Sequence, residues 1–258
     1  NQIFTRMNKY DIKKCKNKDE IIKWQPKKLS FIFSLFDETI LESINNNVEV
    51  SLLQTEPLNL SMRLDPLLNF CKIYPNIKIY DYSKSNIKIL SKYNINNCEY
   101  LSYNIQEYEL NKLKTFLTEN KNNRIYDFGF IYNWKSLPID KQHIINPPRR
   151  RNVVDFLRKN GFKVNIIAGY GDDRDIELSK CKIILNIHGQ INENPKPTHQ
   201  ECSNIFEHIR CDRLLEAGFI VLSETSYELD QKFVNKYPNL KQILYDDFFN
   251  IDIIKQVK

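Results

Sequence analysis

The sequence predicts an α/β protein with two Rossmann-like lobes, each containing a parallel sheet. Short apolar runs typical of buried strands alternate with helical patterns along both halves of the 258 residues. A polar, mostly helical segment at residues 104–123 separates the halves, and all six glycines lie between Gly129 and Gly218. A chain of this length can bury a core in each lobe.

The first half contains four predicted strands. Their apolar runs are residues 29–34, 48–53, 76–80 and 98–103. Helical spacing falls between them, first at Ile40, Leu41 and Ile44 and later at Ile87, Ile89, Leu90 and Tyr93. Strands that alternate with helices indicate βαβ units, in which neighbouring strands run parallel.

The second half repeats this rhythm. Its predicted strands are residues 125–132, 163–168, 181–187 and 219–223, with residues 243–245 as a candidate fifth. Helices are predicted at about 149–160 and 205–217, and Gly161 suits the end of the first because glycine tolerates the left-handed conformation. We therefore predict a first lobe at residues 29–115 and a second lobe at residues 124–258.

The positive charge is confined to one end of the chain. The formal net charge is +6, and residues 1–28 carry nine bases and three acids, which accounts for all of it. The remaining residues are neutral overall, whereas a nucleic-acid-binding domain carries its positive face on the fold. We expect residues 1–28 to be a solvated basic arm and expect no nucleic-acid partner.

The cysteines and the hydropathy of the chain indicate the cellular compartment in which we expect the protein. The six cysteines are scattered without CxxC pairs, which favours a reducing, cytoplasmic setting, that of the host if the chain is viral. No apolar run approaches the roughly 20 residues of a membrane helix, so we expect no transmembrane segment. The chain begins without Met or a signal-peptide core, so it is expected to be a fragment.

Three arginines stand at the start of a predicted helix in the second half. Pro148 suits the first turn of a helix, and Arg149, Arg150 and Arg151 follow it directly. A helix N-terminus attracts phosphate, and arginine adds bidentate anion recognition. A solvated basic turn is the alternative. Three arginines oppose the dipole at this end of a helix, which favours an anion site.

Asn186 and His188 stand at the end of the predicted strand 181–187. Ligands of Rossmann-like sheets bind at the carboxyl ends of strands, so both side chains are candidates for contact with a ligand. His188 could donate to a phosphate or a sugar hydroxyl. The alternative is a buried histidine that is hydrogen-bonded to the backbone.

Three charged residues surround the last predicted helix–strand unit. Glu207 and Arg210 lie three apart on the helix, which also suits a simple surface ion pair. Glu224 ends the following strand, where a carboxylate can accept two ribose hydroxyls or can cap a helix.

A zinc site is disfavoured. His199-x2-Cys202 and His208-x2-Cys211 have residue types that bind zinc, but the second pair falls inside a helix that must pack against the core.

Gly169-Tyr170-Gly171 is interpreted as a turn and not as a phosphate-binding loop, because the acidic residues after it would repel phosphate. Motifs of P-loop proteins, hydrolases with a nucleophile elbow and zincins are absent.

The ordered motifs resemble a known family. The second half contains Lys182-Ile183-x-Leu185-Asn186-x-His188, then Phe206-Glu207-x2-Arg210, then Val221-x-Ser223-Glu224. This pattern resembles the C-terminal half of GT-B glycosyltransferases, especially a bacterial and large-DNA-virus group. In the first half, Leu53-Gln54-Thr55-Glu56 and Asp81-Tyr82-Ser83-x2-Asn86 are similar to the same group's first lobe. The resemblance covers about residues 29–250.

The resemblance implies a glycosyltransferase that moves a sugar from a nucleoside diphosphate to a glycan, glycoprotein or other acceptor hydroxyl. The residues it implies for the donor are Arg150, Arg151, Asn186, His188, Glu207, Arg210 and Glu224. Arg210 is the first choice for the diphosphate, and no metal or other cofactor is required. Retaining or inverting chemistry stays open, because Glu207 and Glu216 have eight residues between them instead of the seven of retaining members.

An inverting enzyme needs a general base in the first lobe. Asp37, Glu56 and Asp81 each follow a predicted strand, and Glu56 is the preferred base, followed by Asp37. Asp37 and Asp81 could instead be helix caps. The alternative function is a catalytically inactive, glycosyltransferase-like module that binds a glycan or a protein.

Overall fold

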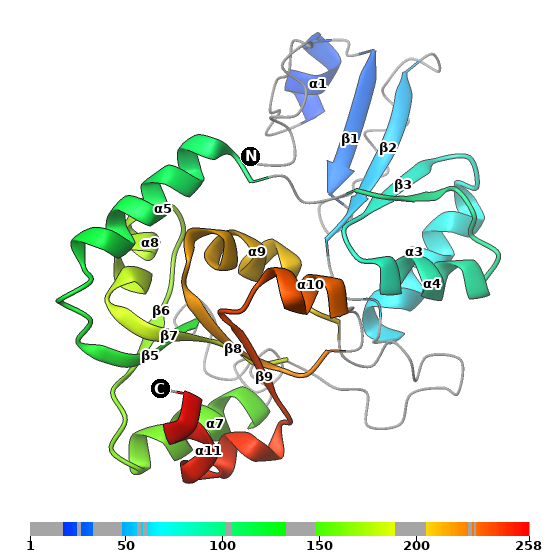
Figure 1. Cartoon of the computed structure of the whole chain (residues 1–258). Coiled ribbons are helices and arrows are strands. Elements are labelled where there is room, and N and C mark those ends of the chain that lie inside the picture. The colour runs from blue at the N-terminus through cyan, green and yellow to red at the C-terminus, as the bar shows by residue number, and fades with distance from the viewer. Residues whose placement is uncertain are drawn as a thin grey trace. The chain divides into compact units, whose positions relative to one another are not determined.

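The computed structural model describes two compact units, each built on its own parallel sheet (Figure 1). The described residues are 18–24, 27–32, 48–55, 58, 61–101, 105–132, 148–188, 205–226, 229 and 231–257. Those up to residue 101 belong to the first unit and those from residue 105 to the second. The predicted α/β class with two Rossmann-like lobes is confirmed. None of the helices in these ranges has the length and apolar character that crossing a membrane requires.

The first unit has a four-stranded sheet in sequence order. Its elements are α1 (Lys18–Trp24), β1 (Lys28–Ile32), β2 (Glu49–Gln54), α3 (Ser61–Ile73), β3 (Lys78–Asp81), α4 (Lys84–Lys92) and β4 (Cys98–Tyr100). Neighbouring strands are parallel and pair in the order β1-β2-β3-β4. Leucines of α3 and α4 pack with Leu52 and Ile79 of the strands in one apolar core.

Part of the predicted basic arm is folded. Residues 18–24 form α1, and Ile21 of this helix is 5% exposed within the core of the first unit. Strand β1 begins at Lys28, the last residue of the predicted arm. The expectation of a solvated arm is therefore wrong for residues 18–24, because the charge count gave no weight to the apolar Ile21.

The second unit has a five-stranded parallel sheet. Its elements are α5 (Glu107–Glu119), β5 (Tyr126–Ile131), α7 (Pro148–Lys159), β6 (Val164–Ile167), α8 (Asp172–Ser179), β7 (Cys181–Asn186), α9 (His208–Ala217), β8 (Ile220–Glu224), α10 (Gln231–Lys236), β9 (Leu240–Ile243), the 3-10 helix η5 (Asp246–Phe249) and α11 (Ile251–Val257). The strands lie in the order β6-β5-β7-β8-β9. The chain therefore runs outward from β5 to β6 and then returns past β5 to β7, which makes β5/β7 the topological switch point.

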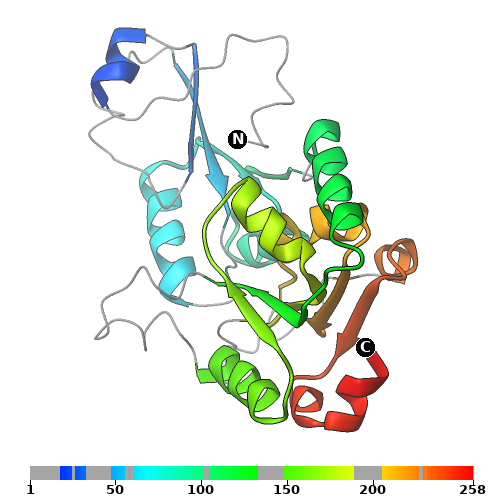
Figure 2. The same ribbon diagram turned by 90° about the vertical axis from the view of Figure 1, so that its left-hand side faces the viewer.

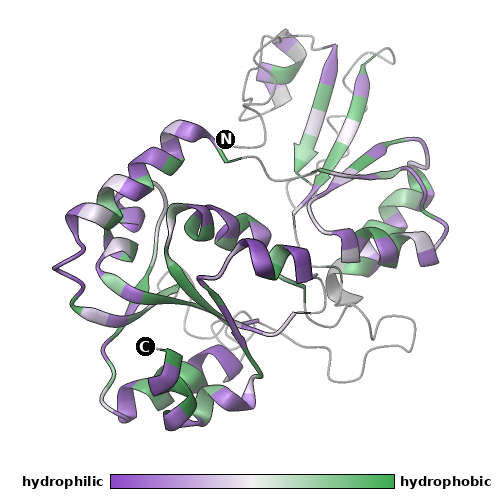
Figure 3. Cartoon of the chain, in the orientation of Figure 1, coloured by the Kyte–Doolittle hydropathy of each residue, from purple (hydrophilic) through white to green (hydrophobic). Residues whose placement is uncertain are grey.

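Helices cover both faces of this sheet. Figures 1 and 2 show α5, α8 and α9 on one side of it and α7 and α11 on the other. Successive residues of a strand point to opposite faces of the sheet, so each face has its own apolar core. In β7, Ile184 packs with α9 on one face and Ile183 packs with α7 on the other. Apolar residues are concentrated on the strands, whereas α5 is largely hydrophilic (Figure 3).

The division between the units falls before α5. Leu113 of this helix is buried in the core that α8 and α9 form, and Asn120 donates a hydrogen bond to Ser179 Oγ at 2.9 Å. The predicted first lobe, residues 29–115, thus extends too far, because its last residues belong to a helix that packs on the second unit.

Helix α8 is tied to α9 by a buried ion pair. Arg213 donates two hydrogen bonds to Asp175, with N–O distances of 2.9 and 2.6 Å. Arg213 is 7% exposed, so this cation lies in the core of the second unit. Since a buried arginine needs a charge partner, Asp175 compensates Arg213 and joins α8 to α9.

Some predicted boundaries differ from the structure. Strand β9 is Leu240–Ile243 instead of residues 243–245, and helix α3 was not expected because Pro66 interrupts its pattern. Residues 169–171 form a bend with two left-handed glycines, as the predicted turn requires. The predicted helical face of Ile40 lies outside the described residues.

Gly129 of β5 gives a test of the second unit's core. A Cβ atom at this position would meet Cys181 Sγ at 2.7 Å and Ile184 Cδ1 at 3.0 Å. Gly129→Ala should therefore lower the free energy of unfolding by about 1–3 kcal/mol, measured by urea denaturation. Adding Cys181→Ala removes one clash and should restore part of that loss. Unchanged stability of the single variant would contradict this packing.

Candidate functional site

Charged and polar side chains meet at the carboxyl edge of the second unit's sheet. The residues come from the starts of α7 and α9 and from the ends of β7, β8 and β9. We call them the carboxyl-edge cluster: Arg149, Arg150, Asn186, His188, Glu207, Arg210, Glu224 and Tyr245. These residues lie beside the switch point, and doubly wound sheets bind their ligands there.

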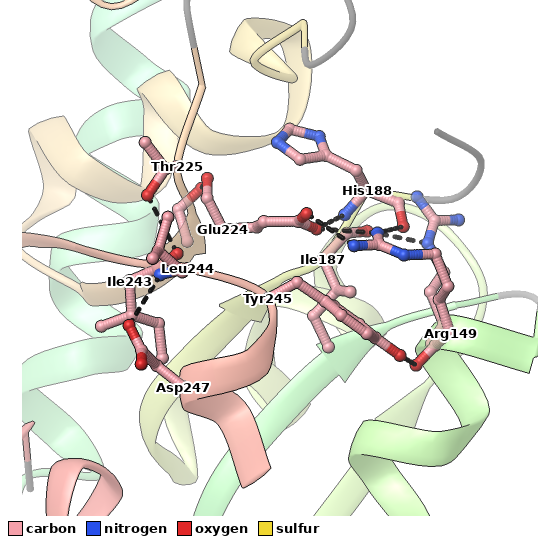
Figure 4. A network of polar contacts seen from close by, with 11 residues as sticks. Arg149, Ile187, His188, Glu224, Thr225, Ile243, Leu244, Tyr245 and Asp247 are labelled. Carbon is pink, nitrogen blue, oxygen red and sulfur yellow. Dashed lines mark hydrogen bonds and ion pairs between the residues drawn. The ribbon is translucent and has the colours of Figure 1, made fainter. Parts of the chain in front are cut away.

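Arg149 and Glu224 form the centre of this cluster (Figure 4). The guanidinium donates to both carboxylate oxygens, at 3.0 and 2.8 Å, and also to the main-chain oxygen of His188 at 3.3 Å. Glu224 additionally accepts a hydrogen bond from the main-chain N–H of His188 at 3.2 Å. The side chain of Glu224 is only 3% exposed, so this carboxylate depends on Arg149 for its charge partner.

Tyr245 makes two contacts with Arg149. Its ring centroid lies 3.6 Å from the guanidinium carbon, and its hydroxyl donates to the main-chain oxygen of Arg149 at 3.1 Å. The turn that carries Tyr245 is fixed on both sides, since Thr225 donates to Ile243 O and Asp247 accepts from the Leu244 N–H (Figure 4). The stacked guanidinium is thus held in one orientation.

Two further arginines converge on one carboxylate. Arg150 donates to Glu207 at 3.0 Å, and Arg210 donates to the other oxygen of Glu207 at 2.6 Å. The Nε of Arg150 is also bonded to the main-chain oxygen of Ile187 at 2.8 Å. Positive charge from α7 and from α9 is therefore concentrated around Glu207.

Asn186 links the carboxyl ends of β7 and β8. Its amide donates to Ser223 Oγ at 3.0 Å, and its oxygen lies 3.5 Å from a nitrogen of Arg210. Ser223 in turn donates to the main-chain oxygen of Glu224. These bonds orient the ends of β7 and β8 relative to each other.

His188 is buried and neutral at physiological pH. Burial lowers its pKa below the ordinary 6.5, and Arg150 and Arg149 act in the same direction, against Glu224 and Glu207. Its Nε2 atom is enclosed and has no hydrogen-bond partner among the described residues. The predicted alternative, a histidine whose side chain is bonded to the backbone, does not hold for this atom.

The structure brings together six of the seven predicted donor residues. Arg150, Asn186, His188, Glu207, Arg210 and Glu224 all belong to the cluster. Arg151 does not: its side chain is 63% exposed and pairs with Asp155 on the same helix. The Glu207–Arg210 pair is present, but it is joined by Arg150 from another helix and is more than a surface pair.

Arg149 and Tyr245 were missed as site residues. Helical spacing could have identified Arg149, because residues four apart share a helix face and Val153, four residues on, is an apolar residue that lies in the core. The same spacing pairs Arg151 with Asp155 and turns it toward solvent. Tyr245 carries no comparable signal, because its role depends on stacking against a residue 96 positions away.

The other predicted acids have different outcomes. Asp37 and Glu56 lie outside the described residues. Asp81 is fully buried, accepts hydrogen bonds from the Ser83 N–H and from the Asn86 amide, and so supports the start of α4. The cap of α4 is Ser83, whose hydroxyl accepts the Asn86 N–H, so the cap alternative is wrong for Asp81, which ends β3 and holds the cap residue in place.

The zinc-like residues that the structure describes serve packing. His208 bonds to Asp212 at 2.9 Å, and burial raises the pKa of the Cys211 thiol well above its ordinary value. His199 and Cys202 lie outside the described residues. Within the described ranges, no group of three His, Cys, Asp or Glu side chains is placed to hold a metal.

Comparisons with known proteins give viral relatives. No family model matches the chain, and no solved structure does. The chain is similar to three proteins of Acanthamoeba polyphaga mimivirus: uncharacterized protein L140 (29% identical over 197 residues, 76% of this chain and 55% of the relative), uncharacterized protein L138 (27% over 196 residues, 75% and 19%) and uncharacterized protein L137 (26% over 237 residues, 90% and 28%). The chain thus spans about half or less of the length of these relatives.

Removing Arg149 should destabilise the second unit strongly. Arg149→Met leaves the buried Glu224 carboxylate without its cation, which should cost about 3–5 kcal/mol of unfolding free energy. Adding Glu224→Gln removes that charge and still accepts the His188 N–H, so the double variant should recover at least half of the loss. Additive losses in urea denaturation would show that the pair is not coupled.

Proposed function

We propose that the chain is a glycosyltransferase that takes a sugar from a nucleoside diphosphate and transfers it to an acceptor hydroxyl of a glycan or glycoprotein. The observation that carries the proposal is the convergence of Arg150 and Arg210 on one carboxylate beside the switch point. Guanidinium groups recognise phosphate oxygens with two hydrogen bonds, and this edge of the sheet is where nucleotides bind.

In this proposal the second unit binds the donor. Arg210 and Arg150 contact the diphosphate and stabilise the negative charge that develops on the leaving group. Asn186 and His188 lie at the end of β7, beside these arginines, and are proposed to contact phosphate or sugar hydroxyls. Glu207 positions both guanidinium groups. Glu224, bound to Arg149, positions the start of α7 instead of serving as a free ribose acceptor.

The first unit is proposed to supply the acceptor site and the general base. Glu56 is the preferred base and Asp37 the second choice. Charge stabilisation by arginine needs no metal, so none is included in the proposal. The free cysteines among the described residues are compatible with a reducing, cytoplasmic setting, which we also propose.

A second candidate is a glycosyltransferase-like module without turnover that binds a glycan or a protein. Asp81 favours it, because this acid of the first unit is buried and engaged by Ser83 and Asn86, and so is unsuited to act as a base. The two candidates share the donor site and differ in catalysis.

Donor binding is tested by thermal shift with UDP-glucose, GDP-mannose and dTDP-glucose. At 100 times Kd, a ligand stabilises by about 2.7 kcal/mol, which should raise the Tm by about 5–11 °C. Arg210→Ala should weaken binding by roughly 10- to 150-fold, the loss expected for hydrogen bonds to a charged group. Arg151→Ala is the matched control and should bind normally. The proposal fails if no nucleotide sugar stabilises the protein, or if both variants lose binding equally.

Catalysis is tested by release of the nucleoside diphosphate from the bound donor. Glu56→Gln should lower the rate by about 10²–10⁴-fold, as expected for loss of a general base, while donor affinity is retained. Donor binding without release by the unmodified protein, across a panel of glycan acceptors, would favour the inactive module. Full activity of both Glu56→Gln and Asp37→Asn would reject the proposed bases.

A further inference from the structure

The enclosed nitrogen of His188 needs a partner. Buried side-chain nitrogen and oxygen atoms are normally hydrogen-bonded, and each exception calls for an explanation. Of the atoms without a partner in the described ranges, only Nε2 of His188 belongs to the carboxyl-edge cluster. The main chain of His188 is engaged with Glu224 and Arg149, whereas Nε2 of its ring has no partner among the described residues.

Charged groups face His188 from three elements. Glu224 lies at the end of β8 and Glu207 precedes α9, and both favour the protonated ring. Arg149 and Arg150 at the start of α7 oppose it. The described cluster as a whole contains three arginines and two glutamates, so with a neutral histidine it carries one net positive charge.

A nucleoside diphosphate sugar brings two negative charges, one on each phosphate. An anion placed near a histidine stabilises the protonated ring, and burial strengthens that interaction because water screens it less. With the ligand bound, the described cluster would hold one net negative charge, and one added proton would neutralise it. Histidine is the side chain whose ordinary pKa allows this change near neutral pH.

We propose that His188 contacts the bound diphosphate through Nε2 and takes up one proton as the donor binds. Protonated His188 would then balance the charge of the cluster against a ligand that carries two negative charges. This inference rests on the proposed function, since it names how the same site recognises its substrate.

The direction of the pH dependence follows from the two states of His188. In the free protein burial lowers the pKa of His188, and in the complex the phosphates raise it. Between those two pKa values the complex holds more protons than the free protein, so affinity rises as pH falls. Uptake of one proton gives at most a tenfold change in Kd per pH unit. Above the pKa of the complex, affinity no longer depends on His188 titration.

The experiment is isothermal titration calorimetry with UDP-glucose, GDP-mannose and dTDP-glucose at several values between pH 5.5 and 8. At each pH the titration is repeated in buffers with different enthalpies of ionisation, and the slope of the observed enthalpy gives the number of protons taken up. We expect a measurable uptake of up to one proton. In His188→Gln, which keeps a side-chain N–H donor but cannot titrate, uptake should disappear and the pH dependence of Kd should flatten.

Two further variants identify the proton acceptor. His208→Gln is the matched control, because His208 pairs with Asp212 outside the cluster, and it should keep the uptake. Glu207→Gln already lacks one negative charge, so it should take up less. Uptake that persists in His188→Gln but is lost in Glu207→Gln would assign the proton to Glu207 and overturn the inference.

The outcomes separate this inference from the proposed function. Donor binding without proton uptake at any of these pH values overturns the role of His188 and leaves the glycosyltransferase proposal standing. Failure of all three nucleotide sugars to bind overturns the proposed function and the inference with it.

Discussion

The bidentate contact between Arg149 and Glu224 holds the segments on which the carboxyl-edge cluster depends. Arg149 starts α7, Glu224 ends β8, and the same pair engages the main chain of His188 after β7. Tyr245 after β9 stacks on the guanidinium. Desolvation offsets much of the attraction in such a buried pair, so its main effect is positional. It fixes the start of α7, and Arg150, one residue further, is then directed at Ile187 and Glu207.

The strand order explains why charges from opposite faces of the sheet meet at one place. Helix α7 covers one face and α9 the other, and their N-termini both follow strands next to the switch point. Arg150 and Arg210 therefore approach Glu207 from different helices. The resulting site has fixed arginines, engaged carboxylates and one neutral histidine, so His188 is the group whose charge can respond to a ligand near neutral pH.

Local patterns predicted the strands and most residues of the carboxyl-edge cluster. Apolar runs located β5, β7 and β8 within one or two residues, and polar residues at the ends of these strands, such as Asn186 and Glu224, were identified as candidates. The errors have local causes. Arg151 was included and Arg149 was left out because the helix face of each arginine was not considered, although the helix directs Arg149 and Arg151 to different faces. The predicted end of the first lobe, residue 115, fell inside helix α5, because the polar residues of this helix were interpreted as a linker between the lobes.

The sequence by itself determined that strands and helices alternate, that the strands are parallel, and that polar residues follow them at one edge. These properties depend on neighbours a few positions apart. Only the tertiary structure decided that β7 lies beside β5, that Glu224 is bound by Arg149, and that α5 packs on the second unit through Leu113. Arg149 and Glu224 are 75 positions apart, and their contact results from how whole helices pack on the sheet. No local spacing encodes that packing, because it depends on the shape and burial of every layer at once.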